Sequence, residues 1–256
     1  ASFKHASVNL GRLQLGLFEA TLFRNIDSTG VRPFDALELN PVIGLNTLLR
    51  GFSGDDGKRL LGLDAKFRLT DKLFTYGQFA LDDPARQRYA WQAGFQWFDL
   101  FRRELHLLVE YNSVTPFAYT SAQARGGYGH YNQPLAHPMG AGVDEAVAIV
   151  DWGIGKRLWL RAQASSAVFR VDTSAATASG SDVFGAYEAF GADSLSVERR
   201  RTWLDLSFAW RINQMSNAQF AVGFIARDVT NAADPQQSHL LYVSFRTGLF
   251  NRYYDL

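Results

Sequence analysis

Apolar and polar residues alternate with a period of two along most of this chain. Between residues 89 and 97 every odd-numbered position is apolar, from Tyr89 to Trp97, while Gln92 and Gln96 stand among the even positions. Because successive side chains of a strand point to opposite faces of the sheet, this period predicts a strand with one apolar and one polar face. A charged turn near Arg102 leads into a second alternating segment at residues 105–111, so the two segments form a predicted hairpin.

The same pattern predicts strands throughout the chain. A first hairpin joins residues 3–10 to 13–23 through a tight turn at Gly11, and the alternation weakens after Glu19, which predicts a β-bulge. Further strands are expected at residues 59–70, 73–82, 89–97, 105–111, 145–153, 158–172, 201–212, 220–227 and 239–250. The segment 38–49, within a long connection at 25–57, suits either a short helix or a strand, and Pro41 argues against a regular central strand.

Short and long connections alternate strictly. Short turns are expected near residues 11, 71, 102, 156 and 215, and the other connections near 30–55, 84, 117–144, 173–193 and 228–238. The polar face carries charges on strand after strand: Asp64, Lys66, Arg68, Glu104, Glu110, Arg161, Asp205, Arg211, Arg227 and Arg246. A soluble barrel would fill its inside with apolar side chains, whereas a membrane barrel faces lipid with its apolar side. The pattern therefore favours an all-β, antiparallel transmembrane β-barrel, with short periplasmic turns and long extracellular loops, over a soluble β-sandwich.

The strand count suggests that this barrel is incomplete. We expect one domain over residues 1–256, whose last strand ends at the periplasmic side. Counting back through about eleven strands places the start of the first strand at the outer side, although single-chain bacterial barrels have even strand numbers and closed edges. We therefore expect additional upstream strands or a closing partner, within a barrel of about 16–18 strands.

Composition narrows the class further. The formal net charge of +1 gives no reason to expect a nucleic-acid partner, and the absence of cysteine removes thiol catalysis and cysteine-based zinc sites. No apolar run approaches the roughly 20 residues of a membrane-spanning helix. The first ten residues show no signal-peptide pattern. The mean hydropathy of −0.14 does not separate the two classes, since the alternating faces of a membrane barrel also average out.

The connection at 115–144 carries the candidate binding residues. Aromatic, amide and imidazole side chains gather in it: Tyr119, Tyr128, His130, Tyr131, Asn132, Gln133 and His137. Such side chains suit a sugar, whose C–H faces pack on aromatic rings while its hydroxyls find donors and acceptors. Alternatively, they bond to one another and fold the connection into the barrel mouth as a plug. No carboxylate stands at ligand spacing beside His130 and His137, so no metal site is predicted there. No cofactor is predicted either.

Several segments resemble one family in the same order. Residues 110–120 (EYNSVTPFAYT) and 128–142 (YGHYNQPLAHPMGAG) are similar to a signature of the Wzi-type capsule-assembly barrels and the RemB-like gliding-motility proteins of Bacteroidetes. The segments 16–20, 39–41, 60–82 and 249–256 are similar to the same family. The resemblance covers nearly the whole chain but only the C-terminal half of a family member. It implies an outer-membrane barrel that tethers surface polysaccharide or serves surface attachment and motility.

The sequence offers no enzyme site. His5 and Ser7 share a strand face without a nucleophile elbow, and neighbouring carboxylates such as Asp82 and Asp83 stand in expected loops. We therefore predict a non-enzymatic protein of the Gram-negative outer membrane. It would contact lipid and lipopolysaccharide and bind surface polysaccharide or another envelope component.

Two interpretations concern the charged residues. We interpret the arginine run 199–201 as a solvated or lipopolysaccharide-contacting rim. We favour a filled, salt-bridged lumen over a conducting one. The alternative function is a channel, or an accessory subunit of a transport or secretion complex.

Overall fold

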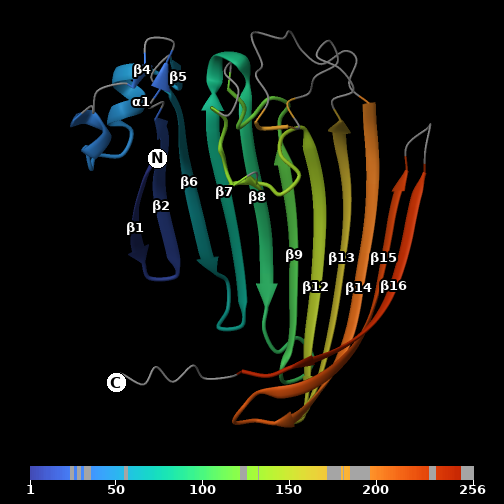
Figure 1. Ribbon diagram of the computed structural model, residues 1–256. Coiled ribbons are helices and arrows are strands. Elements are labelled where there is room, and N and C mark those ends of the chain that lie inside the picture. The colour runs from blue at the N-terminus through green and yellow to red at the C-terminus, as the bar shows by residue number, and fades with distance from the viewer. Residues whose placement is uncertain are drawn as a thin grey trace, which may run out of the picture.

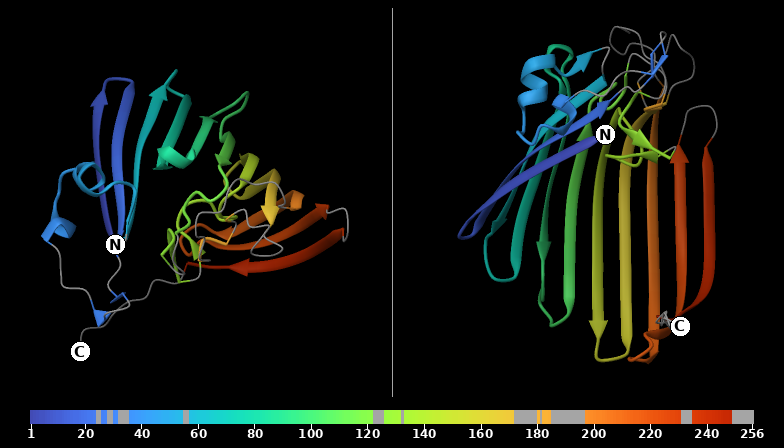
Figure 2. Two further views of the ribbon diagram at one scale, coloured as in Figure 1. Left: turned by 90° about the horizontal axis from the view of Figure 1, so that it is seen from above. Right: turned by 60° about the vertical axis from the view of Figure 1, so that its left-hand side comes forward.

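The computed structural model shows one large antiparallel sheet (Figure 1). The structure describes residues 1–23, 26–27, 30–31, 36–54, 57–121, 126–131, 133–171, 180, 182–184, 197–230 and 235–248. The sheet has twelve strands, and its short strand β5 pairs only with β6, which leaves a path of eleven neighbouring strands from β1 to β16. Seen from above, this path is an open arc (Figure 2), and β1 and β16 form its two unpaired edges in the described part of the chain.

The strands of the large sheet are β1 (Ser2–Leu10), β2 (Leu13–Phe23), β5 (Ser53–Gly54), β6 (Gly57–Arg68), β7 (Leu73–Asp83), β8 (Arg88–Trp97), β9 (Leu105–Val114), β12 (Val143–Ile154), β13 (Leu158–Val171), β14 (Val197–Asn213), β15 (Ala218–Thr230) and β16 (Gln236–Arg246). Two small hairpins are formed by β3 (Ile26–Asp27) with β4 (Gly30–Val31), and by β10 (Gly129–His130) with β11 (Gln133–Pro134). The helical elements are η1 (Ala36–Leu39), α1 (Leu45–Arg50) and η2 (Pro84–Arg86). None of these helices is long and apolar enough to cross a membrane.

The expected strands are present, with shifted ends. β14 begins four residues before the predicted 201 and β15 extends three residues beyond the predicted 227. Within the segment 38–49, residues 45–49 belong to helix α1, so the helical alternative is confirmed there. The predicted bulge after Glu19 is wrong, because Glu19 stays in continuous register with Lys4 on β1 and Leu61 on β6. A polar residue interrupts the apolar face there without any shift of the backbone.

The two faces of the sheet differ in polarity. Large apolar side chains are exposed on the convex face: Leu15, Leu17, Leu63, Trp91, Leu206, Phe208, Val222 and Phe224. The concave face carries charged and amide residues such as Asp64, Gln92 and Glu145, and the segment between β9 and β12 folds against it (Figure 2). The alternation therefore sorts the side chains as predicted, with an apolar outside and a polar inside.

Short turns gather at one end of the sheet and the longer connections at the other (Figure 1). β1 begins at the end with the long connections, and β16 ends at the end with the short turns, as the pattern of connections predicted. Because every neighbouring pair on the eleven-strand path is antiparallel, β1 and β16 run in the same direction. The strands of the large sheet are here called the wall. The buried apolar cluster lies at the long-connection end, where Ala118, Tyr119 and Val183 pack together with wall residues such as Leu60.

Candidate functional site

The segment 115–142, here called the mouth segment, is anchored to the concave wall by a buried ion pair. Lys58 on β6 and Asp82 on β7 bring Nζ and Oδ1 to 2.7 Å, and both side chains are almost inaccessible. Asp82 Oδ2 accepts a hydrogen bond of 3.1 Å from the backbone N–H of Tyr119, and Lys58 also donates to the carbonyl oxygen of Thr120. The pair thus binds one donor and one acceptor of the mouth segment, which explains why this connection lies inside the arc.

A second anchor joins the far end of the mouth segment to β12 and β14. His137 Nε2 lies 3.0 Å from Glu145 Oε2, and the backbone N–H of Met139 donates to His137 Nδ1 over 3.2 Å. Since Nδ1 accepts, Nε2 carries the hydrogen and donates it to Glu145. Arg201 binds the other carboxylate oxygen at 2.7 Å. The interpretation of residues 199–201 as a solvated rim is therefore wrong for Arg201, which points inward to Glu145.

The candidate residues of the mouth segment fall into two groups. Tyr119 and Tyr128 lie inward, with ring centroids 6.0 Å apart. Burial and the nearby Asp82 carboxylate raise the pKa of Tyr119, and burial raises the pKa of Tyr128. These two phenols and the half-buried His137 have the geometry of a plug that packs on the wall.

The other candidates lie at the tip of the segment. The rings of His130 and Tyr131 meet edge to face at 4.2 Å, and Tyr131 is 89% exposed. Gln133 is exposed and pairs with His130 in the small β10–β11 hairpin. Asn132 lies outside the described residues. The sequence grouped all seven candidates together, but the fold separates an inward set from an exposed one.

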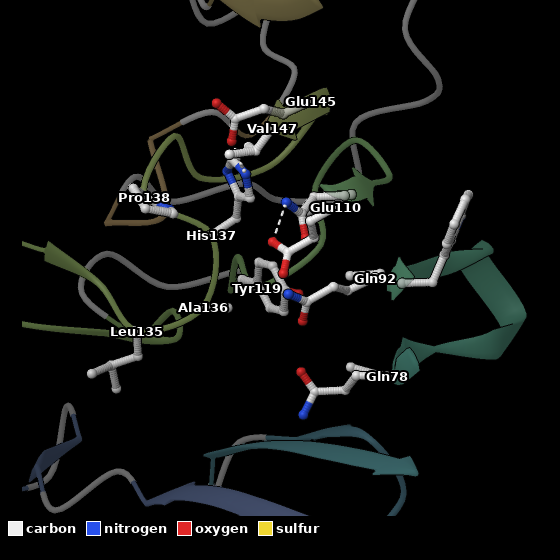
Figure 3. Close-up of a pocket in the computed structure, with 15 residues that line it drawn as sticks. Gln78, Gln92, Glu110, Tyr119, Leu135, Ala136, His137, Pro138, Glu145 and Val147 are labelled. Carbon is white, nitrogen blue, oxygen red and sulfur yellow. Dashed lines mark hydrogen bonds and ion pairs between the residues drawn. The ribbon is translucent and has the colours of Figure 1, made fainter. Parts of the chain in front are cut away.

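A cleft of about 410 Å³, lined by both polar and apolar residues, lies between the mouth segment and the concave wall (Figure 3). Its wall contains a row of residues that face one another directly across neighbouring strands: Gln78, Gln92, Asn112 and Glu145. Tyr119 and His137 line it from the mouth segment. The alternation placed Gln92 on the polar face, but only the strand register brings all four residues into one row.

A second cleft of about 470 Å³ continues this polar surface along the wall. It shares Gln78 and Gln92 with the first cleft and is also lined by His5 and Asp64, whose Nε2 and Oδ2 atoms lie 3.1 Å apart. Glu110 lines the first cleft and accepts hydrogen bonds from the Tyr76 hydroxyl at 2.6 Å and from an amide. Hydrogen-bonding groups therefore line an uninterrupted part of the concave face.

Metal chemistry finds no support in the side-chain arrangement. Among the described residues, no group of three or more histidine, aspartate or glutamate side chains is placed to hold a metal ion. His137 does acquire a carboxylate neighbour that sequence spacing did not suggest, but Arg201 takes the other oxygen of that carboxylate. The arrangement is that of a structural anchor.

Comparison with known proteins leaves the family open. No family model and no curated protein matches the chain. The crystal structure of the outer membrane protein OprD from Pseudomonas aeruginosa is similar over 95% of this chain and 68% of that chain, with 11% identity and a TM-score of 0.39. An improved crystal structure of Pseudomonas aeruginosa OprD is similar over 96% of this chain and 70% of that chain, with 11% identity and a TM-score of 0.36. A variant of OccD1 (OprD) is similar over 96% of this chain and 68% of that chain, with 12% identity and a TM-score of 0.36. Likeness at this level assigns neither family nor function, and the resemblance to the Wzi-type barrels stays a prediction.

Proposed function

We propose that this chain forms part of a transmembrane β-barrel in a Gram-negative outer membrane, and that its polar lumen admits small hydrophilic solutes past the mouth segment. The observation that carries the proposal is the distribution of polarity over the curved sheet. Large apolar side chains are exposed over the convex face, while the concave face holds two adjoining clefts whose linings mix amides and carboxylates with apolar side chains. Hydrocarbon suits the first face and water the second.

The mouth segment narrows the lumen in this proposal. It is fixed at two points, by the Lys58–Asp82 pair and by His137 on Glu145, so its position is determined by the wall. Between these points it leaves the cleft lined by amides and by Glu110. Polar groups that line a narrow passage select solutes by size and hydrogen bonding, which is how constrictions in membrane pores act.

Conductance across a planar lipid bilayer tests the proposal. We expect the protein isolated from outer membranes to conduct small ions, and the Asp82→Asn variant to conduct more, because loss of the charged anchor releases the mouth segment. Asp71→Asn is the matched control, since it removes a carboxylate from an exposed short turn at the other end of the sheet. A protein that conducts no better than the empty bilayer would contradict the proposal and return the lumen to the filled state favoured from sequence.

A second candidate function is attachment of surface polysaccharide, and the exposed ring pair of His130 and Tyr131 favours it. An aromatic face beside an imidazole offers both the packing surface and the hydrogen bonds that a sugar needs. Unlike Tyr128, these two rings lie outside the apolar packing of the mouth segment.

Binding of purified capsular polysaccharide tests this second function. We expect Tyr131→Ala and His130→Ala to weaken binding several-fold, in line with the roughly 1 kcal/mol that one aromatic contact contributes. Val31→Ala serves as the control, because Val31 is exposed at the same end of the sheet in β4. Equal binding by all variants would remove the tip from the candidate sites.

A further inference from the structure

The segment 39–51, here called the outer belt, lies on the convex face with its polar residues turned toward the wall. Glu19 on β2 is 1% exposed and accepts hydrogen bonds from Thr47, at 3.1 Å from the backbone N–H and 2.7 Å from the hydroxyl. Lys4 on β1 bridges Glu19 at 2.7 Å and the carbonyl oxygen of Val42 at 3.3 Å. Arg59 on β6 donates to the carbonyl oxygen of Gly51 at 3.2 Å.

Four large apolar residues of the outer belt are exposed, whereas Ile43 and Leu45 are partly buried. Leu48 is 82% exposed and Leu39 is 74% exposed, and Val42 and Leu49 are also mostly exposed. Asn46 and Thr47, in contrast, are the buried residues of helix α1. The segment therefore exposes large apolar side chains while it buries Asn46 and Thr47, the reverse of a surface helix that packs on a protein in water.

The surroundings of the segment explain this reversed polarity. In water, exposing four large apolar side chains while burying hydrogen-bonding groups would be unfavourable at both surfaces. In hydrocarbon the same arrangement is favourable, because apolar side chains face the acyl chains while Thr47 and Lys4 bind Glu19 beneath the segment. The charges of Lys4 and Glu19 neutralise each other beneath the segment.

An apolar groove of about 560 Å³ lies next to the outer belt on the same convex face. Its walls include Ala6, Val8, Leu15, Leu17 and Leu63. Leu17 and Leu63 face each other across β2 and β6, one side-chain step beyond Glu19 and Leu61, which also face each other. The groove therefore begins where the cover of the outer belt ends.

We propose that the outer belt lies in the acyl-chain region of the outer leaflet, and that the groove beside it holds a lipid hydrocarbon chain. The inference rests on the proposed membrane location of the sheet and adds a specific lipid-binding surface to it. A lipid is favoured over a protein partner because the groove continues into the exposed apolar convex face, whereas protein interfaces carry a polar rim. Asp64, which also lines the groove, lies 3.1 Å from His5 Nε2, and Lys4 and Glu19 are engaged with each other and with the belt.

The absence of cysteine in the chain makes site-directed spin labelling a clean test. Single nitroxide labels would be placed on the Leu48→Cys variant for the belt and on Val8→Cys for the groove, in full-length protein reconstituted into phosphatidylethanolamine–phosphatidylglycerol vesicles. Leu206→Cys, exposed at the middle of β14, is the control for the convex wall, and Tyr131→Cys is the control for the watery mouth. Paramagnetic resonance then measures collision with oxygen, which concentrates in hydrocarbon, and with a nickel chelate, which stays in water.

We expect the labels at positions 48 and 8 to collide with oxygen and to be shielded from nickel, like the label at 206 and opposite to the label at 131. If the label at position 48 collides with nickel and the label at 206 does not, the belt lies in water. This result overturns the inference about the belt and leaves the proposed membrane location of the sheet intact. An immobilised position 48 label shielded from both reagents indicates a protein partner and also overturns it. If the label at 206 itself meets nickel, the membrane location of the whole sheet is wrong.

Discussion

Two buried ion pairs perform the same task on opposite faces of the sheet. Asp82 pairs with Lys58 on the concave face and binds the backbone N–H of Tyr119, while Glu19 pairs with Lys4 on the convex face and binds the backbone N–H of Thr47. In each case a carboxylate on a strand pairs with a lysine and accepts a hydrogen bond from a backbone N–H of a long connection. The charges are thus paired within the protein, and each pair holds a connection against the sheet.

At this scale we predict strong coupling between Lys58 and Asp82. Lys58→Met or Asp82→Asn alone should lower the free energy of unfolding by roughly 3–5 kcal/mol, because the remaining charge stays buried without a partner. The double variant Lys58→Met/Asp82→Asn should lose much less than the sum, since neither charge remains. Urea unfolding in micelles measures these free energies, and hydrogen exchange at Tyr119 reports release of the mouth segment. Additive losses in the double variant would show that the pair is not the anchor.

At the scale of elements, β6 holds two connections through two consecutive residues. Lys58 points to the concave face and donates to the mouth segment, while Arg59 points to the convex face and donates to the carbonyl oxygen of Gly51. Alternation along the strand sends neighbouring side chains to opposite faces, so one strand end can fix an inner and an outer connection at once. The long-connection end of β6 therefore determines where both the mouth segment and the outer belt lie.

At the scale of the whole molecule, the open arc presents two unpaired edges that run in the same direction. Joining β1 directly to β16 would create a parallel seam in an otherwise antiparallel sheet, whereas an odd number of further strands would close it with antiparallel pairs throughout. That such strands exist, in the same polypeptide or in a partner, stays a prediction from sequence.

Cross-linking tests this geometry. We expect a short thiol cross-linker to join Leu17→Cys with Leu63→Cys, which face each other across β2 and β6, and to leave Ala6→Cys and Val243→Cys on the two edge strands unjoined within one molecule. The first pair is the positive control for reactivity on the convex face. Efficient joining of the edge pair would show that the sheet closes on itself and needs no further strands.

The sequence determined the strands, their two faces and the alternation of short and long connections, because all three depend on neighbouring residues and a period of two. It could not place Glu19 or Arg201 correctly. Glu19 binds Thr47, which is 28 residues away, and Arg201 binds Glu145, which is 56 residues away. The predicted bulge at Glu19 and the predicted rim position of Arg201 were both inferred from neighbouring residues. The structure shows that long-range contacts determine where these two side chains lie.

The candidate site shows the same division. Residue types in the segment 115–144 suggested a sugar surface or a plug, but only the fold separated the inward Tyr119 and His137 from the exposed His130 and Tyr131. The row from Gln78 to Glu145 exists because the strand register sets four distant residues side by side. Local alternation decides which face a side chain occupies, and tertiary pairing decides what it meets there, because hydrogen bonds and ion pairs act between atoms that are close in space and not in sequence.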